Sequence, residues 1–296
     1  MFFATYKATM KTLLRAALLW MVAALVLGVV IECGLRIGHS RTLVENGKIV
    51  GHVMDNEPEF REYMDHNFYV QTVMNSQNAC LMSYAMPAFA VLSTMLVLSR
   101  DHKDNFFEIE KSSGVKTSSY FFGRFAALLT VNSAVCIIAG FTGLHTYFFS
   151  RGGPPDFFSS LWEYFAESTV RVLRVFCLAQ ILTILFFIGI TYMVGSLLKS
   201  SFAGGVIGFA YVLFTYATGT FLRMRLPEYY LNYLTPKSNY HYIYWGLYDS
   251  NLFDTTHLTI GNPFDVTDVL ICTGYLLGIS LVFFTVSFIC TKRRSI

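Results

Sequence analysis

The residues of this sequence that could do chemistry gather in one charged segment between two apolar runs. Its basic residues are Arg100, Lys103, Lys111 and Lys116, and its acidic residues are Asp101, Asp104, Glu108 and Glu110. The chain contains no phosphate-binding loop of the form GxxxxGK[ST], no HExxH and no GxSxG. We therefore predict no catalytic residue and no nucleotide site on this chain. An energy source, if one is used, must lie on another subunit.

Metal and ion sites have little support in the sequence. The seven histidines are scattered, and their spacing matches no zinc template. An ion-coupled carrier normally holds its ion with a carboxylate at mid-membrane depth, whereas Glu32 and His145 fall near the ends of apolar runs. Asn132, Gln180 and backbone carbonyls are the groups left to bind an ion. We predict no metal site, and the pattern argues against ion-coupled transport.

The composition is that of an integral membrane protein. Apolar residues make up 54% of the chain and charged residues 14%. The apolar runs reach the roughly 20 residues that a helix needs to cross about 30 Å of hydrocarbon. They are apolar at nearly every position, which excludes the alternating pattern of a membrane barrel. We predict an all-α integral membrane fold, and a net charge of +3 gives no reason to expect a nucleic-acid partner.

Six apolar runs predict six transmembrane helices in a single transmembrane domain over residues 1–296. The runs are Ala16–Ile31, Ala79–Ser99, about Tyr120–Phe149, about Val172–Leu198, about Phe202–Phe221 and Val269–Cys290. Residues 1–12 mix aromatic and basic side chains, which favours a helix in the membrane interface. The polar segments between runs predict a first outer loop at 38–78, an inner segment at 100–119 and a last outer segment at 222–268.

The basic residues set the orientation. Lys7, Lys11 and Arg15, the region 100–124, Lys199, and residues 292–294 all fall on one side of a six-helix topology. By the positive-inside rule this side is cytoplasmic, so both termini are predicted to be cytoplasmic. A tight inner turn is expected at residues 199–201.

Small residues mark the start of the fifth run. Gly204 and Gly208 form a GxxxG pair, a spacing that lets two helices approach closely in a membrane. We expect close helix packing there.

Three stretches give the chain a resemblance to a known family. The first is the inner segment Arg100 to Arg124, with a basic start, an acidic middle, Gly114 and a basic return. The second is Gly195-Ser-Leu-Leu-Lys-Ser-Ser-Phe-Ala203, and the third is Leu234-Thr-Pro236. With the six runs, these resemble the membrane (permease) subunit of a type 2 ABC exporter. The segment departs from the family in lacking a proline near residues 117–119, and the first outer loop is longer than in minimal members.

The resemblance implies a coupling segment at 100–119 that docks on a partner ATP-binding subunit. Its contact residues would be Phe106, Phe107, Glu108, Ile109, Glu110 and Lys111. The aromatic and aliphatic side chains would bury apolar surface, and the charged ones would set the register by complementarity. No cofactor is implied on this chain, because ATP and Mg belong to the partner.

The resemblance also implies an assembly and a substrate class. Two ATP-binding subunits and a second permease, identical or related, would form the transporter in a cell membrane, with lipid around it. A bacterial cytoplasmic membrane is the implied location. An amphipathic peptide, lipid or drug-like substrate would follow a path lined by Tyr84, Met86, Phe89, Tyr211, Phe214 and Tyr216.

Two other functions remain open at this point. A membrane-embedded enzyme or its accessory subunit would need a polar cluster at one membrane face, and the outer polar residues are too dispersed to name one. An ion-coupled secondary transporter would depend on a proton or sodium gradient, and its activity would be lost on changing Glu32 or Gln180.

Overall fold

The computed structural model describes residues 1–45, 48–54, 84–103, 109, 112–150, 180–220 and 266–293. These contain seven helices and one hairpin of two strands. The elements are α1 (Phe2–Arg15), α2 (Ala17–His39), β1 (Ser40–Glu45), β2 (Lys48–Met54), α4 (Met86–Lys103), α6 (Thr117–Ser150), α9 (Ile181–Leu197), α10 (Ser201–Thr220) and α13 (Val266–Arg293).

The predicted helical class is confirmed, with an addition. Thr117–Gly140 of α6 and Leu270–Arg293 of α13 are each long and apolar enough to cross a membrane, and α1 and α2 together make a third such span if the bent pair counts as one. The hairpin lies in the segment that we predicted only as a polar loop. Its strands pair antiparallel from Ser40 with Met54 to Glu45 with Lys48.

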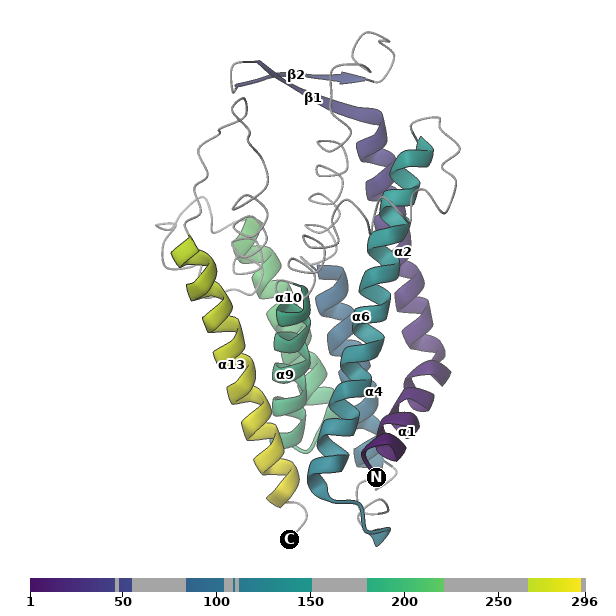
Figure 1. Ribbon diagram of the computed structural model, residues 1–296, viewed down its shortest axis with the longest axis vertical. Coiled ribbons are helices and arrows are strands. Elements are labelled where there is room, and N and C mark those ends of the chain that lie inside the picture. Colours follow the sequence, from purple (N-terminus) through teal and green to yellow (C-terminus); the bar gives the residue numbers. More distant parts are fainter. Residues whose placement is uncertain are drawn as a thin grey trace.

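The long helices form an elongated bundle (Figure 1). α2, α6 and α10 run away from the end that carries both termini, and α4, α9 and α13 return to it. The hairpin lies at the opposite end. α9 packs against α13, α10 and α4, while α6 packs against α1 and α2.

α9 is the centre of the bundle, because it is apolar on all sides and buried on nearly all of them. Its residues Phe186, Phe187 and Ile188 are almost completely inaccessible to solvent. A helix without a polar face must be surrounded by other helices or by lipid. Aromatic rings join it to its neighbours, as where Phe186 lies 5.3 Å from Tyr211 of α10 and 5.4 Å from Phe283 of α13, measured between ring centroids.

A tight turn joins α9 to α10 at the position predicted. Lys199 adopts a left-handed backbone with φ of 52°, and the Ser200 N–H donates to the Gly195 carbonyl over 3.1 Å. The Ser200 hydroxyl then accepts from the Ala203 N–H at 3.2 Å, which is the usual N-cap bond. The chain can therefore reverse direction within three residues.

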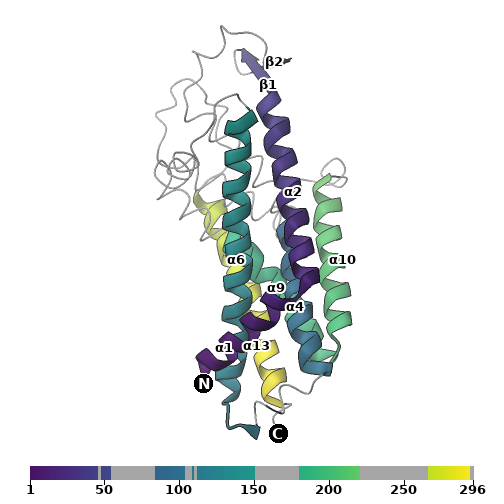
Figure 2. The same cartoon turned by 90° about the vertical axis from the view of Figure 1, so that its right-hand side faces the viewer.

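α1 does not continue the line of α2. Ala16 is extended, with φ of −77° and ψ of 98°, and the axes on either side of it differ by 68°. The indole N–H of Trp20 donates to the carbonyl of Leu14 over 2.8 Å, so a carbonyl in the last turn of α1 gains a partner. α1 consequently lies across the lower part of α6 (Figure 2).

Gly204 should be intolerant of any side chain, because a Cβ there would lie 2.6 Å from the Thr191 carbonyl oxygen and 3.0 Å from Gly195 Cα. These are backbone atoms of α9 and cannot rotate away. We expect Gly204→Ala to destabilise the protein by about 1–3 kcal/mol through overpacking. The measurement is the thermal unfolding midpoint of the purified chain in mild detergent.

The matched control is Gly278→Ala in α13, where an added Cβ would meet nothing within 4 Å. It should leave the unfolding midpoint unchanged or raise it slightly, since alanine favours the helix over glycine. Equal losses in the two variants would contradict the close contact of α9 with α10.

Candidate functional site

The inner segment of residues 100–119 is described at both ends and at Ile109. Arg100–Lys103 finish α4, and α6 starts at Thr117. Of the predicted coupling residues, Phe106, Phe107, Glu108, Glu110 and Lys111 lie outside the described residues. Ile109 is described, and 56% of it is exposed.

The Ile109 backbone is helical and is hydrogen-bonded to Ser112 and Ser113. Its carbonyl accepts from the Ser113 N–H at 3.2 Å and from the hydroxyls of Ser112 and Ser113 at 2.7 Å each. Gly114 follows with φ of +79°, the left-handed conformation that commonly ends a helix. The Ile109 carbonyl is thus hydrogen-bonded while its large apolar side chain is exposed.

A buried ion pair joins the two helices that flank this segment. Arg124, in the second turn of α6, pairs with Asp101 near the end of α4. Their side chains are 2% and 7% exposed. The Arg124 guanidinium also donates to the Val97 carbonyl at 3.4 Å and lies 4.2 Å from the centroid of the Tyr120 ring. A buried charge must be paired and hydrogen-bonded to be tolerated. Here Asp101 supplies the counter-charge, and the Val97 carbonyl and the Tyr120 ring supply further contacts.

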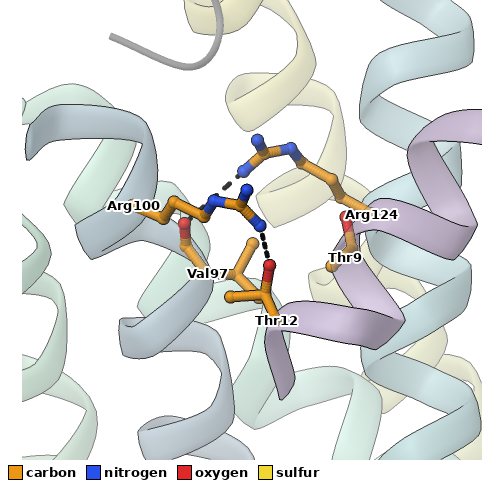
Figure 3. A pocket seen from close by; sticks show the side chains of 5 residues that line it. All are labelled: Thr9, Thr12, Val97, Arg100 and Arg124. Carbon is orange, nitrogen blue, oxygen red and sulfur yellow. Dashed lines mark hydrogen bonds between the residues drawn. The ribbon is translucent and has the colours of Figure 1, made fainter. Parts of the chain in front are cut away.

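α1 joins the same cluster through Arg100, the neighbour of Asp101. The Arg100 guanidinium donates to the Thr12 hydroxyl, and Thr12 in turn donates to the Ala8 carbonyl at 3.0 Å. Figure 3 shows Arg100 and Arg124 approaching this region from different helices. We call Arg100, Asp101 and Arg124, with Thr12 and Tyr120, the ionic cluster.

The ionic cluster is packed rather than open. The cavity lined by Thr9, Thr12, Val97, Arg100 and Arg124 has a volume of about 10 Å³, which is about the lower limit for one water molecule. A substrate or nucleotide does not fit there. The arrangement can fix three helices to one another, but it offers no binding pocket.

Further contacts hold α1 against α6. A Cβ at Gly123 would lie 3.0 Å from the Phe2 carbonyl oxygen and 3.1 Å from Thr5 Cβ, so the glycine permits the close approach of the two backbones. The Tyr6 hydroxyl donates to the Thr130 hydroxyl at 3.3 Å. α1 is therefore bound to α6 on both sides of Arg124.

The residues of the predicted substrate path differ in their exposure: some are buried in the core and others are exposed. Met86 and Phe89 of α4 are buried in the core, at 0% and 1% exposed. Tyr211 and Phe214 of α10 lie 5.8 Å apart between ring centroids. Phe214 is exposed, and so is Tyr84, which precedes α4. The side chain of Tyr216 lies outside the described residues. The path stays a prediction.

The two groups considered for ion binding form hydrogen bonds between helices. The Asn132 amide donates to the Ser93 hydroxyl at 2.9 Å and to the Leu128 carbonyl at 2.8 Å. The Cys136 thiol lies 3.3 Å from Gln180 Oε1. Such bonds commonly join transmembrane helices. They connect α6 with α4 and with the beginning of α9.

Sequence reasoning identified Arg124 as the basic return of the inner segment but assigned no special role to Asp101. The signal was present, because an arginine eight residues into an apolar helix requires a partner charge. Four acidic residues of the same segment could have supplied it, and only the packing of α4 on α6 selects Asp101.

No family model, curated protein or solved structure matches the chain.

Removal of one charge from the ion pair should destabilise the protein strongly. We expect Arg124→Met to cost about 3–5 kcal/mol of unfolding free energy, since Asp101 would remain buried without its main counter-charge. The double variant Asp101→Leu/Arg124→Met should recover much of this loss, because no unpaired charge remains. Thermal unfolding of the purified chain in detergent measures both.

The control for this pair is Arg293→Met, which removes a charge from an exposed position near the end of α13 and should leave the unfolding midpoint unchanged. A double variant no more stable than Arg124→Met would contradict the role of the pair.

Proposed function

We propose that this chain is the permease subunit of an ATP-driven ABC transporter. It exports an amphipathic peptide, lipid or drug-like substrate, and ATP with Mg is bound and hydrolysed on two copies of a separate ATP-binding subunit. A second permease, identical or related, completes the path. The site of action is a cell membrane, in a bacterium the cytoplasmic membrane.

The first support is the arrangement of the long helices. α2, α4, α6, α9, α10 and α13 alternate in direction, as six successive crossings require. The basic residues of α1, the turn at Lys199 and the end of α13 lie at one end of the bundle together with both termini. That distribution favours a cytoplasmic location for this end.

The observation that carries the proposal is the ionic cluster. It joins the last turn of α4 to the second turn of α6 and, through Thr12, to α1. The inner segment begins and ends at these two helices, so a force on the segment acts on all three at once. A rigid base is what a permease needs if ATP binding elsewhere is to tilt its helices.

The docking surface is assigned to residues 106–111 within the inner segment. Ile109 exposes an apolar side chain, and its carbonyl accepts a hydrogen bond from the Ser113 N–H. Its neighbours in sequence add Phe106 and Phe107 with Glu108, Glu110 and Lys111. Apolar contact would supply affinity, and the charges would select the partner and its register. ATP-dependent closure of the partner would then bias the bundle between inward and outward opening.

The test is purification of the affinity-tagged chain from its native membrane in mild detergent, followed by mass spectrometry and an ATPase assay. We expect an ATP-binding subunit to copurify with the wild type. Glu108→Lys/Glu110→Lys should lower its recovery by at least about tenfold, because like charges placed across an interface are strongly unfavourable.

The matched control is Glu57→Lys/Glu59→Lys, an identical change of charge in the predicted outer loop, which should leave recovery unchanged. The absence of any ATPase in the wild-type preparation would overturn the proposed function. Equal recovery with both double variants would overturn the docking surface.

A further inference from the structure

One face of α1 is buried against the rest of the protein. Thr5, Thr9 and Leu13 follow at intervals of four residues and are 1%, 4% and 0% exposed. Residues at this spacing lie on one side of a helix, and here that side contacts α6 and α4. The rotation of α1 about its own axis is therefore determined, and the opposite face must point away from the bundle.

That opposite face carries a basic stripe. Lys7, Lys11 and Arg15 also follow at intervals of four, about half a turn from the buried residues, and all three are exposed. No aspartate or glutamate occurs before Glu32, so no acidic side chain of α1 or of the first turns of α2 reduces this charge. The stripe is a surface of one sign.

Exposed apolar side chains border the stripe. Phe3 is 79% exposed and Leu14 is 51% exposed. Around the helix axis both lie within about an eighth of a turn of Lys7, at one edge of the stripe. Beyond the bend, Trp20 and Met21 are 49% and 65% exposed. Basic residues next to exposed aromatic and aliphatic ones are the pattern of a helix that binds a membrane surface.

We infer that the outward face of α1 is a binding surface for acidic phospholipid headgroups. The lipid phosphates would pair with Lys7, Lys11 and Arg15, while Phe3 and Leu14 would enter the upper acyl region. The 68° bend at Ala16 leads directly into apolar α2, which places this face at a bilayer boundary. A bilayer therefore accounts for both the charges and the apolar border, whereas an acidic soluble protein or free phosphate accounts for the charges alone.

This inference requires only that the chain resides in a membrane and does not rest on the ATP-binding partner. Its test uses the purified full chain, stripped of lipid in detergent and offered equal amounts of phosphatidylglycerol and phosphatidylcholine with identical acyl chains. Native mass spectrometry counts each bound lipid. We expect a clear preference for phosphatidylglycerol in the wild type, falling by at least about tenfold in Lys7→Gln/Lys11→Gln/Arg15→Gln.

The matched control is Lys116→Gln/Lys199→Gln/Arg293→Gln, which removes three exposed charges from other elements at the same end of the bundle and should retain the preference. Lys7→Arg/Lys11→Arg/Arg15→Lys, which keeps every charge, should retain it as well. Thermal unfolding midpoints within the wild-type range verify that each variant is folded. Equal binding of the two lipids by the wild type, or equal losses in the α1 variant and the control, would overturn the inference.

Discussion

The buried ion pair of Arg124 with Asp101 fixes how α4 and α6 pack together at the end of the bundle where α4 ends and α6 begins. An arginine placed inside an apolar helix is tolerated only where a counter-charge reaches it. Asp101 can do so only if the end of α4 lies beside the second turn of α6. The same position of α4 brings Arg100 to the Thr12 hydroxyl, so the position of α1 is fixed as well. One electrostatic requirement thereby sets the relative positions of three helices.

Above the ionic cluster the bundle is held by close packing. Lipid tails are as apolar as the side chains, so helices in a membrane associate through dispersion contacts and hydrogen bonds. Gly204 lets α10 approach the backbone of α9, and Asn132 joins α6 to Ser93 of α4. The Asn132 contact continues the joining of α4 and α6 beyond the ionic cluster, and the Gly204 contact joins α10 to α9. A displacement at the inner segment would therefore reach the bundle as a movement of whole helices, which is the behaviour that the proposed permease function needs.

The helices were largely predictable because twenty apolar residues in a row admit few structures in lipid. The prediction missed the hairpin of β1 and β2, although Asn46-Gly47 stands between its strands and is a strong sequence signal for a hairpin. The substrate path stays a prediction. The resemblance placed Met86 and Phe89 along it, and the structure buries both in the core. Residue type does not reveal which side of an apolar helix faces its neighbours.

The sequence by itself determined that the chain carries helices apolar enough to cross a membrane, roughly where the described helices lie, and which segments carry its charge. Those properties depend on composition and local order along the chain. Tertiary structure alone decided which of the four acidic residues near Arg100 pairs with Arg124, and which faces of α1 are buried and exposed. Both depend on the rotation and separation of helices distant in sequence. The buried side of α1 carries Thr5 and Thr9, and the hydrophobicity of the residues alone would not have selected that side.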